Sequence, residues 1–355
     1  MSDFNIAQFK RNILTKNLNI LIGSGVSNPA IPLMNFFFKD DKGMAVSKEI
    51  ANTNLENHIW KVSSFLLWNH NDRIKYFVEN MDKQTLYSID YLTELKNFNT
   101  FEYNIGYVLE RYVKFLEKVI TLLYTSNSRT VSKSVNIFTT NYDLFIESSL
   151  DLLMENENFI FNDGTNGYFH KVLDSSNYNK SVAYRGLNEN YLNELPSISL
   201  IKPHGSMNWE KGENNQILIR PCTVNYPVVV RPTGLEGQET YLNNHFHDML
   251  RVFQLELDKP QSVLIVIGFS FQDDHIAKMI RRALKNPELM IYIFCYADRD
   301  FDVIKKNLSL DNIPRNLQIV LPSDLEVENK NTLSTSGNFD ISSLTKLFII
   351  EDEEV

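Results

Sequence analysis

Four short polar turns hold most of the side chains in this sequence that could carry out chemistry. They lie at residues 23–27, 139–143, 202–206 and 268–271, and a short run of apolar residues precedes each one. The turns supply closely spaced glycines, an amide at Asn141, a carboxylate at Asp143 and an imidazole at His204. Glycine turns before helices bind anions, and the polar groups can orient a ligand or move a proton. The turns together predict a small-molecule site.

The first turn has glycine spacing typical of a phosphate-binding loop. Gly23, Ser24 and Gly25 follow an apolar run directly, and glycines there let the backbone turn tightly and approach a diphosphate. Ser27 can cap the helix expected next. Asn28 replaces the third glycine of the dinucleotide-binding fingerprint, and no convincing acidic residue follows at the expected offset, which disfavours a dehydrogenase. Many strand–helix connections carry glycines for steric reasons alone, so that alternative stays open.

The second and third turns could each serve a ligand or only the fold. Thr140, Asn141 and Asp143 follow an apolar run, where polar side chains can point at a ligand. Alternatively, Asn141 or Asp143 caps the helix that follows. His204 precedes a glycine, and an imidazole with such access is a credible general base near neutral pH. A loop histidine without a chemical role is the alternative.

The sequence predicts no metal site. His245 and His247 could suggest one, but no third ligand accompanies them at a sensible spacing, so we expect them on a helix surface. The two cysteines, Cys222 and Cys295, cannot build a Cys₄ zinc ribbon or a disulfide framework. Residues 273–275 are expected to cap the next helix, because negative charge suits a helix N-terminus.

The apolar runs indicate the strands of one sheet. They lie at residues 19–22, 135–138, 198–202 and 263–267, with a fifth at 290–295. Short apolar runs that alternate with helical patterns indicate a parallel sheet covered on both faces. We therefore expect an α/β fold with a Rossmann-like parallel sheet and helices on both faces. Ligands of such sheets bind beyond the carboxyl ends of the strands, where all four turns lie.

We expect one domain over residues 1–325 with two insertions. The first, at about 40–132, has helical periodicity and is expected to hold no zinc. The second, at about 155–197, is rich in Asn, Tyr and Gly, which predicts hairpins or a long loop outside the sheet core. Because the second insertion lies between the strand ends that bear Asn141 and His204, we expect it to cover the pocket and control access.

A linker and C-terminal tail are expected over residues 326–355. The tail contains a short apolar element at 341–350 and an acidic end. This element and the helical insertion offer apolar surface for self-assembly or for a partner.

Composition excludes several classes of protein. The 355-residue chain is 43% hydrophobic and 22% charged, which is ordinary for a globular protein. Lys and Arg number 35 against 44 Asp and Glu, and the net charge of −9 disfavours direct nucleic-acid binding, since phosphate contacts depend on basic residues. No apolar run approaches the ~20 residues of a membrane span, and no secretory signal is present, so we expect a cytoplasmic protein without membrane contact.

In their order along the chain, the four turns closely resemble those of the sirtuin family. Gly-Ser-Gly-Val-Ser at 23–27 resembles the family's Gly-Ala-Gly-x-Ser phosphate turn, and Thr-Thr-Asn-Tyr-Asp at 139–143 its Thr-x-Asn-x-Asp segment. Lys-Pro-His-Gly at 202–205 resembles the catalytic turn, and Gly-Phe-Ser at 268–270 a later one. The fuller pattern is similar to the bacterial sirtuin-like effector branch. The resemblance spans about residues 17–298.

The resemblance implies binding of NAD and cleavage of its nicotinamide–ribose bond. His204 would act as the base on a ribose hydroxyl or on water, with Asn141 as its catalytic partner. The family's Ile-Pro-Asp segment becomes Ile31-Pro32-Leu33, without the acid. The implied contacts are Gly23, Ser24, Gly25 and Ser27 with the diphosphate and adjoining ribose, Thr140, Asn141 and Asp143 with the nicotinamide ribose, and Gly268, Phe269 and Ser270 with the adenosine half.

The absence of a four-cysteine set decides the expected reaction. Deacylase sirtuins carry a zinc ribbon that supports their peptide cleft, and two cysteines cannot make one. Without that cleft, water becomes the expected acceptor, and the chain resembles an NAD⁺ glycohydrolase that forms ADP-ribose and nicotinamide. The resemblance further implies an anti-phage effector that depletes NAD⁺, a homo-oligomer and a possible HerA-type ATPase partner. A zinc-free protein deacylase and a non-catalytic module sensing NAD or ADP-ribose remain alternatives.

Overall fold

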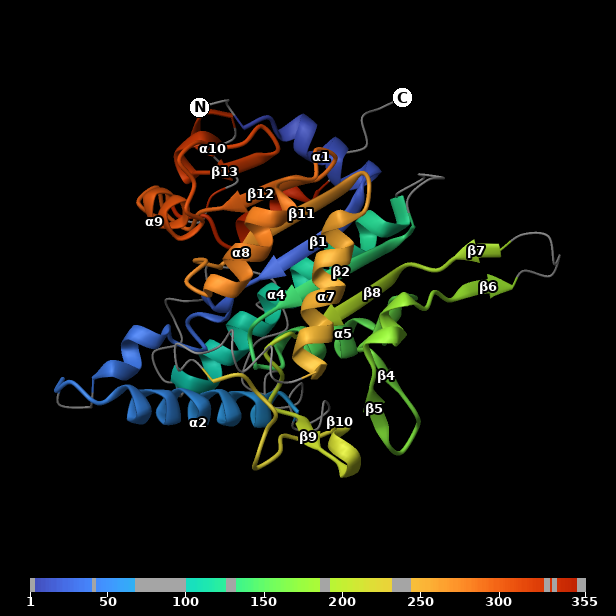
Figure 1. Cartoon of the computed structure of the whole chain (residues 1–355), viewed down its shortest axis with the longest axis vertical. Helices are drawn as coiled ribbons and strands as arrows, with labels where there is room; N and C mark the ends of the chain where they lie inside the picture. Colours follow the sequence, from blue (N-terminus) through green and yellow to red (C-terminus); the bar gives the residue numbers. More distant parts are fainter. Residues whose placement is uncertain are drawn as a thin grey trace, which may run out of the picture.

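The computed structural model of the chain describes residues 4–39, 43–67, 100–125, 132–185, 192–231, 244–328, 333 and 337–349. Parts of both predicted insertions and of the predicted linker lie outside these residues. A seven-stranded sheet forms the centre, in the order β13-β12-β11-β1-β2-β8-β3 (Figure 1). Every neighbouring pair in it is parallel, which confirms the predicted α/β fold with a Rossmann-like sheet.

The four central strands bring the polar turns to one edge of the sheet. In register, the last residue of β1 lies opposite the last residues of β2 and β11, so these strands end level. The order reverses at β1, because β2 and β11 pair on opposite sides of it, and such a switch point is where ligands bind. The strands are β1 (Asn17–Ile22), β2 (Ser134–Thr139), β3 (Ile160–Asn162), β8 (Ser197–Ile201), β11 (Ser262–Ile267), β12 (Met290–Phe294) and β13 (Leu317–Val320).

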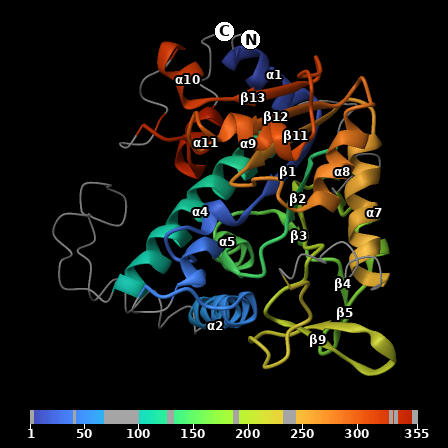
Figure 2. The same cartoon turned by 60° about the vertical axis from the view of Figure 1, so that its left-hand side comes forward.

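Helices cover both faces because alternate residues of each strand point to opposite sides. Ile20 and Ile22 belong to one apolar core, and Leu21 belongs to the other. Figure 2 shows α4 and α5 on one side of the sheet and α7 and α8 on the other. The first face carries α1 (Ile6–Thr15), α4 (Thr100–Thr125), α5 (Phe145–Leu153) and α11 (Ile341–Leu347); the second carries α7 (Asn244–Asp258), α8 (Asp274–Ala283) and α9 (Asp300–Asn307).

Helical structure is confirmed for the described parts of the first predicted insertion. α2 (Lys48–Leu66) and α4 account for it. However, α4 is a full member of the sheet-covering layer, with Val108, Tyr112 and Phe115 completely buried in the first core. Its apolar stripe at helical spacing therefore packs inside this chain.

The apolar tail element also packs inside the chain, which corrects the expectation of a free apolar surface there. Ile341, Leu344 and Leu347 of α11 are buried against α4. Arg111 of α4 forms an ion pair with Asp340, the residue that caps α11. α10 (Pro322–Glu328) spans the predicted boundary between residues 325 and 326.

The second predicted insertion contains hairpins, as expected, but it also completes the main sheet. β3 pairs with β8 as the edge strand, which corrects the expectation that the whole insertion lies outside the sheet. With three residues, β3 is too short to show a periodic pattern in the sequence. β4 (Thr165–Asn166) and β5 (Lys171–Leu173) join β9 (Trp209–Lys211) and β10 (Ile217–Ile219) in an antiparallel sheet, and β6 (Ala183–Arg185) pairs with β7 (Leu192–Glu194).

Across the ranges that the structure describes, no helix combines the length and the apolar character needed to cross a membrane.

The packing of α11 predicts the effect of truncating its side chains. Leu344→Ala should lower the free energy of unfolding by about 2–5 kcal/mol, because Leu344 is 0% exposed and its loss leaves a cavity. Ile349→Ala, two residues beyond α11 and 43% exposed, should change it by about 0.5 kcal/mol or less. Urea unfolding of the two variants checks this. A Leu344→Ala variant that unfolds like the wild type but changes its oligomer size would place this face against another chain instead.

Candidate functional site

The four polar turns converge on a cavity of about 860 Å³ at the carboxyl edge of the sheet. Its lining contains nine of the eleven residues predicted for the site: Ser24, Ser27, Thr140, Asn141, Asp143, His204, Gly268, Phe269 and Ser270. The two others, Gly23 and Gly25, are not among the lining residues. Four segments that are far apart along the chain therefore line one cavity.

Gly23 and Gly25 serve close packing between two turns. The Gly23 amide donates to the Ile267 carbonyl at 2.9 Å, and the Gly25 amide donates to the Gly268 carbonyl at 3.0 Å. A Cβ atom on Gly23 would lie 2.3 Å from the Gly268 carbonyl oxygen, which no side chain tolerates. The steric alternative thus accounts for these glycines, and a contact with a diphosphate stays a prediction.

Ser27 does not cap a helix, which corrects the expectation from the sequence. It ends the 3₁₀ helix η1 (Ser24–Ser27), and the chain continues in the extended conformation at Asn28, which precedes Pro29. A residue before proline disfavours the helical region, so no α-helix follows here. The Ser27 hydroxyl instead donates to Oδ2 of Asp143 at 2.9 Å and lies 3.2 Å from the hydroxyl of Tyr112.

Asn141 presents an unpaired amide oxygen in the cavity wall. Its Nδ2 donates to the Gly23 carbonyl and to Oγ of Ser27, each at 3.3 Å, which orients the amide. Its Oδ1 is buried without a hydrogen-bond partner among the described residues, and the residue is 8% exposed. A buried unpaired acceptor costs about 1–3 kcal/mol, which a ligand hydroxyl or water that donates to it would recover. Asn141 is therefore arranged to accept a hydrogen bond and does not cap α5.

Asp143 contacts the start of α5 and also lines the cavity. Its Oδ1 accepts from the Phe145 amide at 3.2 Å, at the start of α5, while its Oδ2 accepts from Ser27. Burial raises the pKa of its carboxyl group, and the Lys202 ammonium and the Ser27 hydrogen bond oppose that shift. The carboxylate is thus shared between the helix start and the cavity wall.

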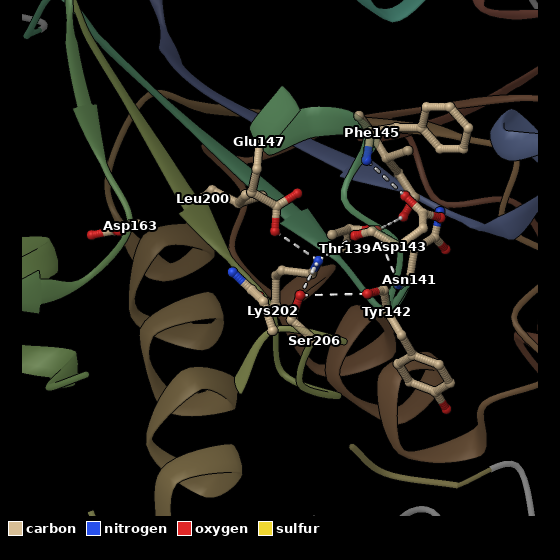
Figure 3. Close-up of polar contacts among 12 residues, drawn as sticks. Thr139, Asn141, Tyr142, Asp143, Phe145, Glu147, Asp163, Leu200, Lys202 and Ser206 are labelled. Carbon is tan, nitrogen blue, oxygen red and sulfur yellow. Dashed lines mark hydrogen bonds and ion pairs between the residues drawn. The ribbon is translucent and has the colours of Figure 1, made fainter. Parts of the chain in front are cut away.

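Lys202 holds the second and third turns together, a role that the sequence pattern did not reveal. Its ammonium is 2% exposed and donates to the Asp143 carbonyl at 2.6 Å and to Glu147 Oε1 and Ser206 Oγ at 2.8 Å each (Figure 3). Burial raises the pKa of Glu147, and Lys202 opposes that shift. The one sequence signal for this role of Lys202 was its position directly after an apolar strand. A charge at such a position is unfavourable unless acceptors surround it.

His204 lies in the cavity wall next to a second histidine. It is 3% exposed, and its Nε2 lies 2.8 Å from Nε2 of His275, in the first turn of α8. Burial and the neighbouring His275 lower the pKa of His204 to about 3, so the imidazole is neutral at physiological pH. The sequence reasoning missed His275, because it was expected only to help cap α8. Asp273 holds the N-cap position without a side-chain capping hydrogen bond.

The opposite wall comes from the segment after the first turn. Ile31, Pro32, Leu33 and Met34 line the cavity together with Leu55 and Ile59 of α2. Leu33, which replaces the acid of the sirtuin pattern, thus lies at the predicted site.

None of the described residues of the predicted 155–197 insertion lines the cavity, which corrects the expectation that this segment covers the pocket. For the described residues of this segment, a short sequence distance to Asn141 and His204 does not bring them to the cavity.

The other candidate residues lie away from the cavity. His245 and His247 are on α7, as predicted, and Nε2 of His245 bonds to the Asn215 carbonyl at 2.9 Å. Within the described ranges, no three His, Cys, Asp or Glu side chains are grouped so that they could hold a metal ion.

Comparison with known protein families finds a match to the part of the chain that carries three of the four turns. A family model described as a SIR2-like domain matches residues 135–313, just over half of the chain. This match contains the turns with Asn141, His204 and Ser270, and it supports a sirtuin-like fold. No curated protein matches the chain.

The depressed pKa of His204 predicts a pH-dependent stability. Below pH of about 6.5 the unfolded chain binds a proton at His204, whereas the folded chain does so only near pH 3. Folded stability is therefore lost as the pH falls through this window. The wild type should lose stability more steeply than His204→Gln, by up to about 1.4 kcal/mol per pH unit. Urea unfolding at several pH values between 7 and 4 measures the difference, and parallel curves for the two proteins would contradict it.

Proposed function

We propose, from the premise that this chain belongs to the SIR2-like domain family, that it is an NAD⁺ glycohydrolase. SIR2-like domains use NAD. The proposed reaction transfers the ADP-ribosyl group from nicotinamide to water, with ADP-ribose and nicotinamide as products. The observation that carries the proposal is that Asn141, with its unpaired buried oxygen, and His204, with its neutral imidazole, line one cavity.

The cavity suits a dinucleotide in size. Its volume of about 860 Å³ lies within the range of small-molecule sites. The lining includes Lys48 and Lys278, whose cations could meet an anionic diphosphate, together with Asp143, Asp273 and Asp274. Lys278 forms an ion pair with Asp274 at 2.6 Å. The turn at Gly268, Phe269 and Ser270 offers backbone and an aromatic ring for the adenosine half, as the resemblance implies. These contacts are part of the proposal.

The two central residues would divide the chemistry between them. Asn141 Oδ1 can accept a hydrogen bond from a ribose hydroxyl or from the attacking water and fix its direction. His204, neutral at physiological pH, can accept the proton that this group loses. Nicotinamide leaves as a neutral base, so bond cleavage needs no acid on the leaving group. It needs polar groups placed around a developing positive charge in a site without bulk solvent.

Water is the proposed acceptor because the chain cannot make the zinc ribbon of deacylase sirtuins with two cysteines. A zinc-free deacylase would use the same Asn141 and His204. An acyl-lysine peptide assay separates the two, since a deacylase consumes NAD⁺ only with the peptide present.

The proposed biological role is that of an anti-phage effector that depletes NAD⁺. It rests on the resemblance of the turns to the bacterial effector branch. Homo-oligomer formation and a HerA-type ATPase partner remain predictions of the same resemblance.

The first test is loss of the base. His204→Ala should lower NAD⁺ cleavage about 10²–10⁴-fold, because general-base catalysis contributes a factor of this size. His245→Ala, which changes a histidine on α7 outside the cavity, serves as the matched control and should retain activity. Purified proteins are incubated with NAD⁺ and the products are separated by chromatography. Full activity in His204→Ala would remove this residue from the mechanism, and no products from the wild type would refute the proposed reaction.

The second test separates orientation from binding. Asn141→Ala should lower turnover more than it lowers NAD⁺ affinity, because an oriented acceptor matters most in the transition state. Asn166→Ala, on the exposed hairpin of β4, is the control. Turnover per bound NAD⁺ and the dissociation constant are measured separately. If affinity falls while turnover per bound NAD⁺ is unchanged, Asn141 only holds the ligand.

A further inference from the structure

Two histidines from distant parts of the chain form a buried pair in the cavity wall. His204 comes from the turn after β8, and His275 comes from the first turn of α8. Their Nε2 atoms are 2.8 Å apart, and their rings are tilted by 30° with centroids 4.9 Å apart. Both residues line the cavity. At this distance one Nε2 carries a hydrogen and the other accepts it.

The direction of this hydrogen bond decides whether His204 can act as a base. If His275 donates, the one lone pair of His204 is occupied and its Nδ1 carries a hydrogen. If His204 donates, its Nδ1 keeps a lone pair. Among the described residues, Nδ1 of His204 makes no hydrogen bond, so this atom is available to a ligand. Only the second arrangement leaves a proton acceptor.

We propose that His275 accepts the Nε2–H of His204 and thereby holds His204 in the tautomer whose Nδ1 can take a proton. This inference rests on the proposed function, because it assigns a positioning residue to the same reaction. His275 then has the place that a carboxylate has in catalytic triads, where the partner fixes the tautomer of the base.

The pair also gives the abstracted proton a second position. The O–H bond of water or of a ribose hydroxyl breaks, and an Nδ1–H bond forms on His204. The Nε2–H bond of His204 breaks as an Nε2–H bond forms on His275, which leaves His204 neutral and His275 as an imidazolium. One proton enters the pair and one positive charge results, so no other reactant is needed. The low pKa of His204 makes such a second acceptor useful, since His204 alone holds a proton weakly.

The surroundings of His275 favour this role. His275 lies in the first turn of α8, at the positive end of the helix dipole. The neighbouring Asp274 carboxylate interacts with His275 electrostatically and can stabilise a transient charge there. The other charged groups that line the cavity are Asp143, Asp273, Lys48 and Lys278.

The tautomer can be measured without any activity. In the full chain with ¹⁵N-labelled histidine, His204 is assigned from the signals missing in His204→Gln. We expect the ring signals of an imidazole with hydrogen on Nε2 and a bare Nδ1. In His275→Ala this pattern should change to a mixture of both tautomers. Hydrogen on Nδ1 of His204 in the wild type, or an unchanged pattern in His275→Ala, would overturn the proposal. This result does not depend on whether NAD⁺ is cleaved.

Kinetics separate positioning from a structural role. His275→Ala should lower turnover about 10²-fold, at the lower end of general-base effects, with NAD⁺ affinity within about twofold of the wild type. His275→Gln should recover about tenfold of this loss, because an amide oxygen can accept the Nε2–H without carrying the proton. His245→Gln is the control.

A double variant completes the test. In a His204→Ala background, His275→Ala should cause no further loss, because it acts through His204. An equal loss with and without His204, or a His275→Gln variant no better than His275→Ala, would overturn the positioning role. A wild type that cleaves no NAD⁺ would refute the proposed function. The tautomer measurement would still show which of His204 and His275 donates the hydrogen bond.

Discussion

The buried ammonium of Lys202 fixes the geometry on which the site depends. A charge removed from water is tolerated only if acceptors surround it, and this one has three, from the loop after β2, from α5 and from the turn after β8. Moving any one of these segments would remove one of the three acceptors of a buried charge, which is costly. The segments that carry Asn141 and His204 are therefore held in one relative position by a group that touches neither side chain.

Further hydrogen bonds join each turn to its neighbour along the sheet edge. Thr139 Oγ1 donates to the Ile22 carbonyl at 2.8 Å, which ties β2 to β1, and Gly25 donates to Gly268, which ties the β1 turn to the β11 turn. The Asn141 amide bonds to Gly23 across the same edge. Because the parallel strands end level, these short bonds form without bending any strand, and the cavity wall becomes one connected unit. α4 reaches this unit through Tyr112, so the helical layer also positions the site.

Local pattern was enough to predict the sheet and the convergence of the four turns at its carboxyl edge, since strong apolar runs and their polar ends are encoded within a few residues. Contacts between distant residues were not predictable in this way. His275 looked like part of a helix cap, and only the packing of α8 against the β8 turn brings it to His204. The tail helix looked like free apolar surface because its partner, α4, lies more than two hundred residues earlier in the chain. The strand β3 was not predicted, because three residues are too few to show an alternating apolar pattern.

The same burial that assembles the site also limits the basicity of its base. Desolvation lowers the pKa of His204 and raises that of Asp143, so both groups are shifted toward their neutral forms. In a site of this kind, the orientation of the polar groups matters more than the strength of the base. An oriented amide in a dry, low-dielectric wall interacts strongly with a developing charge. A hydrogen bond between the imidazoles of His204 and His275 is consistent with that balance. It orients the base without placing a permanent charge beside it, whereas a buried carboxylate in the place of His275 would carry its own desolvation cost.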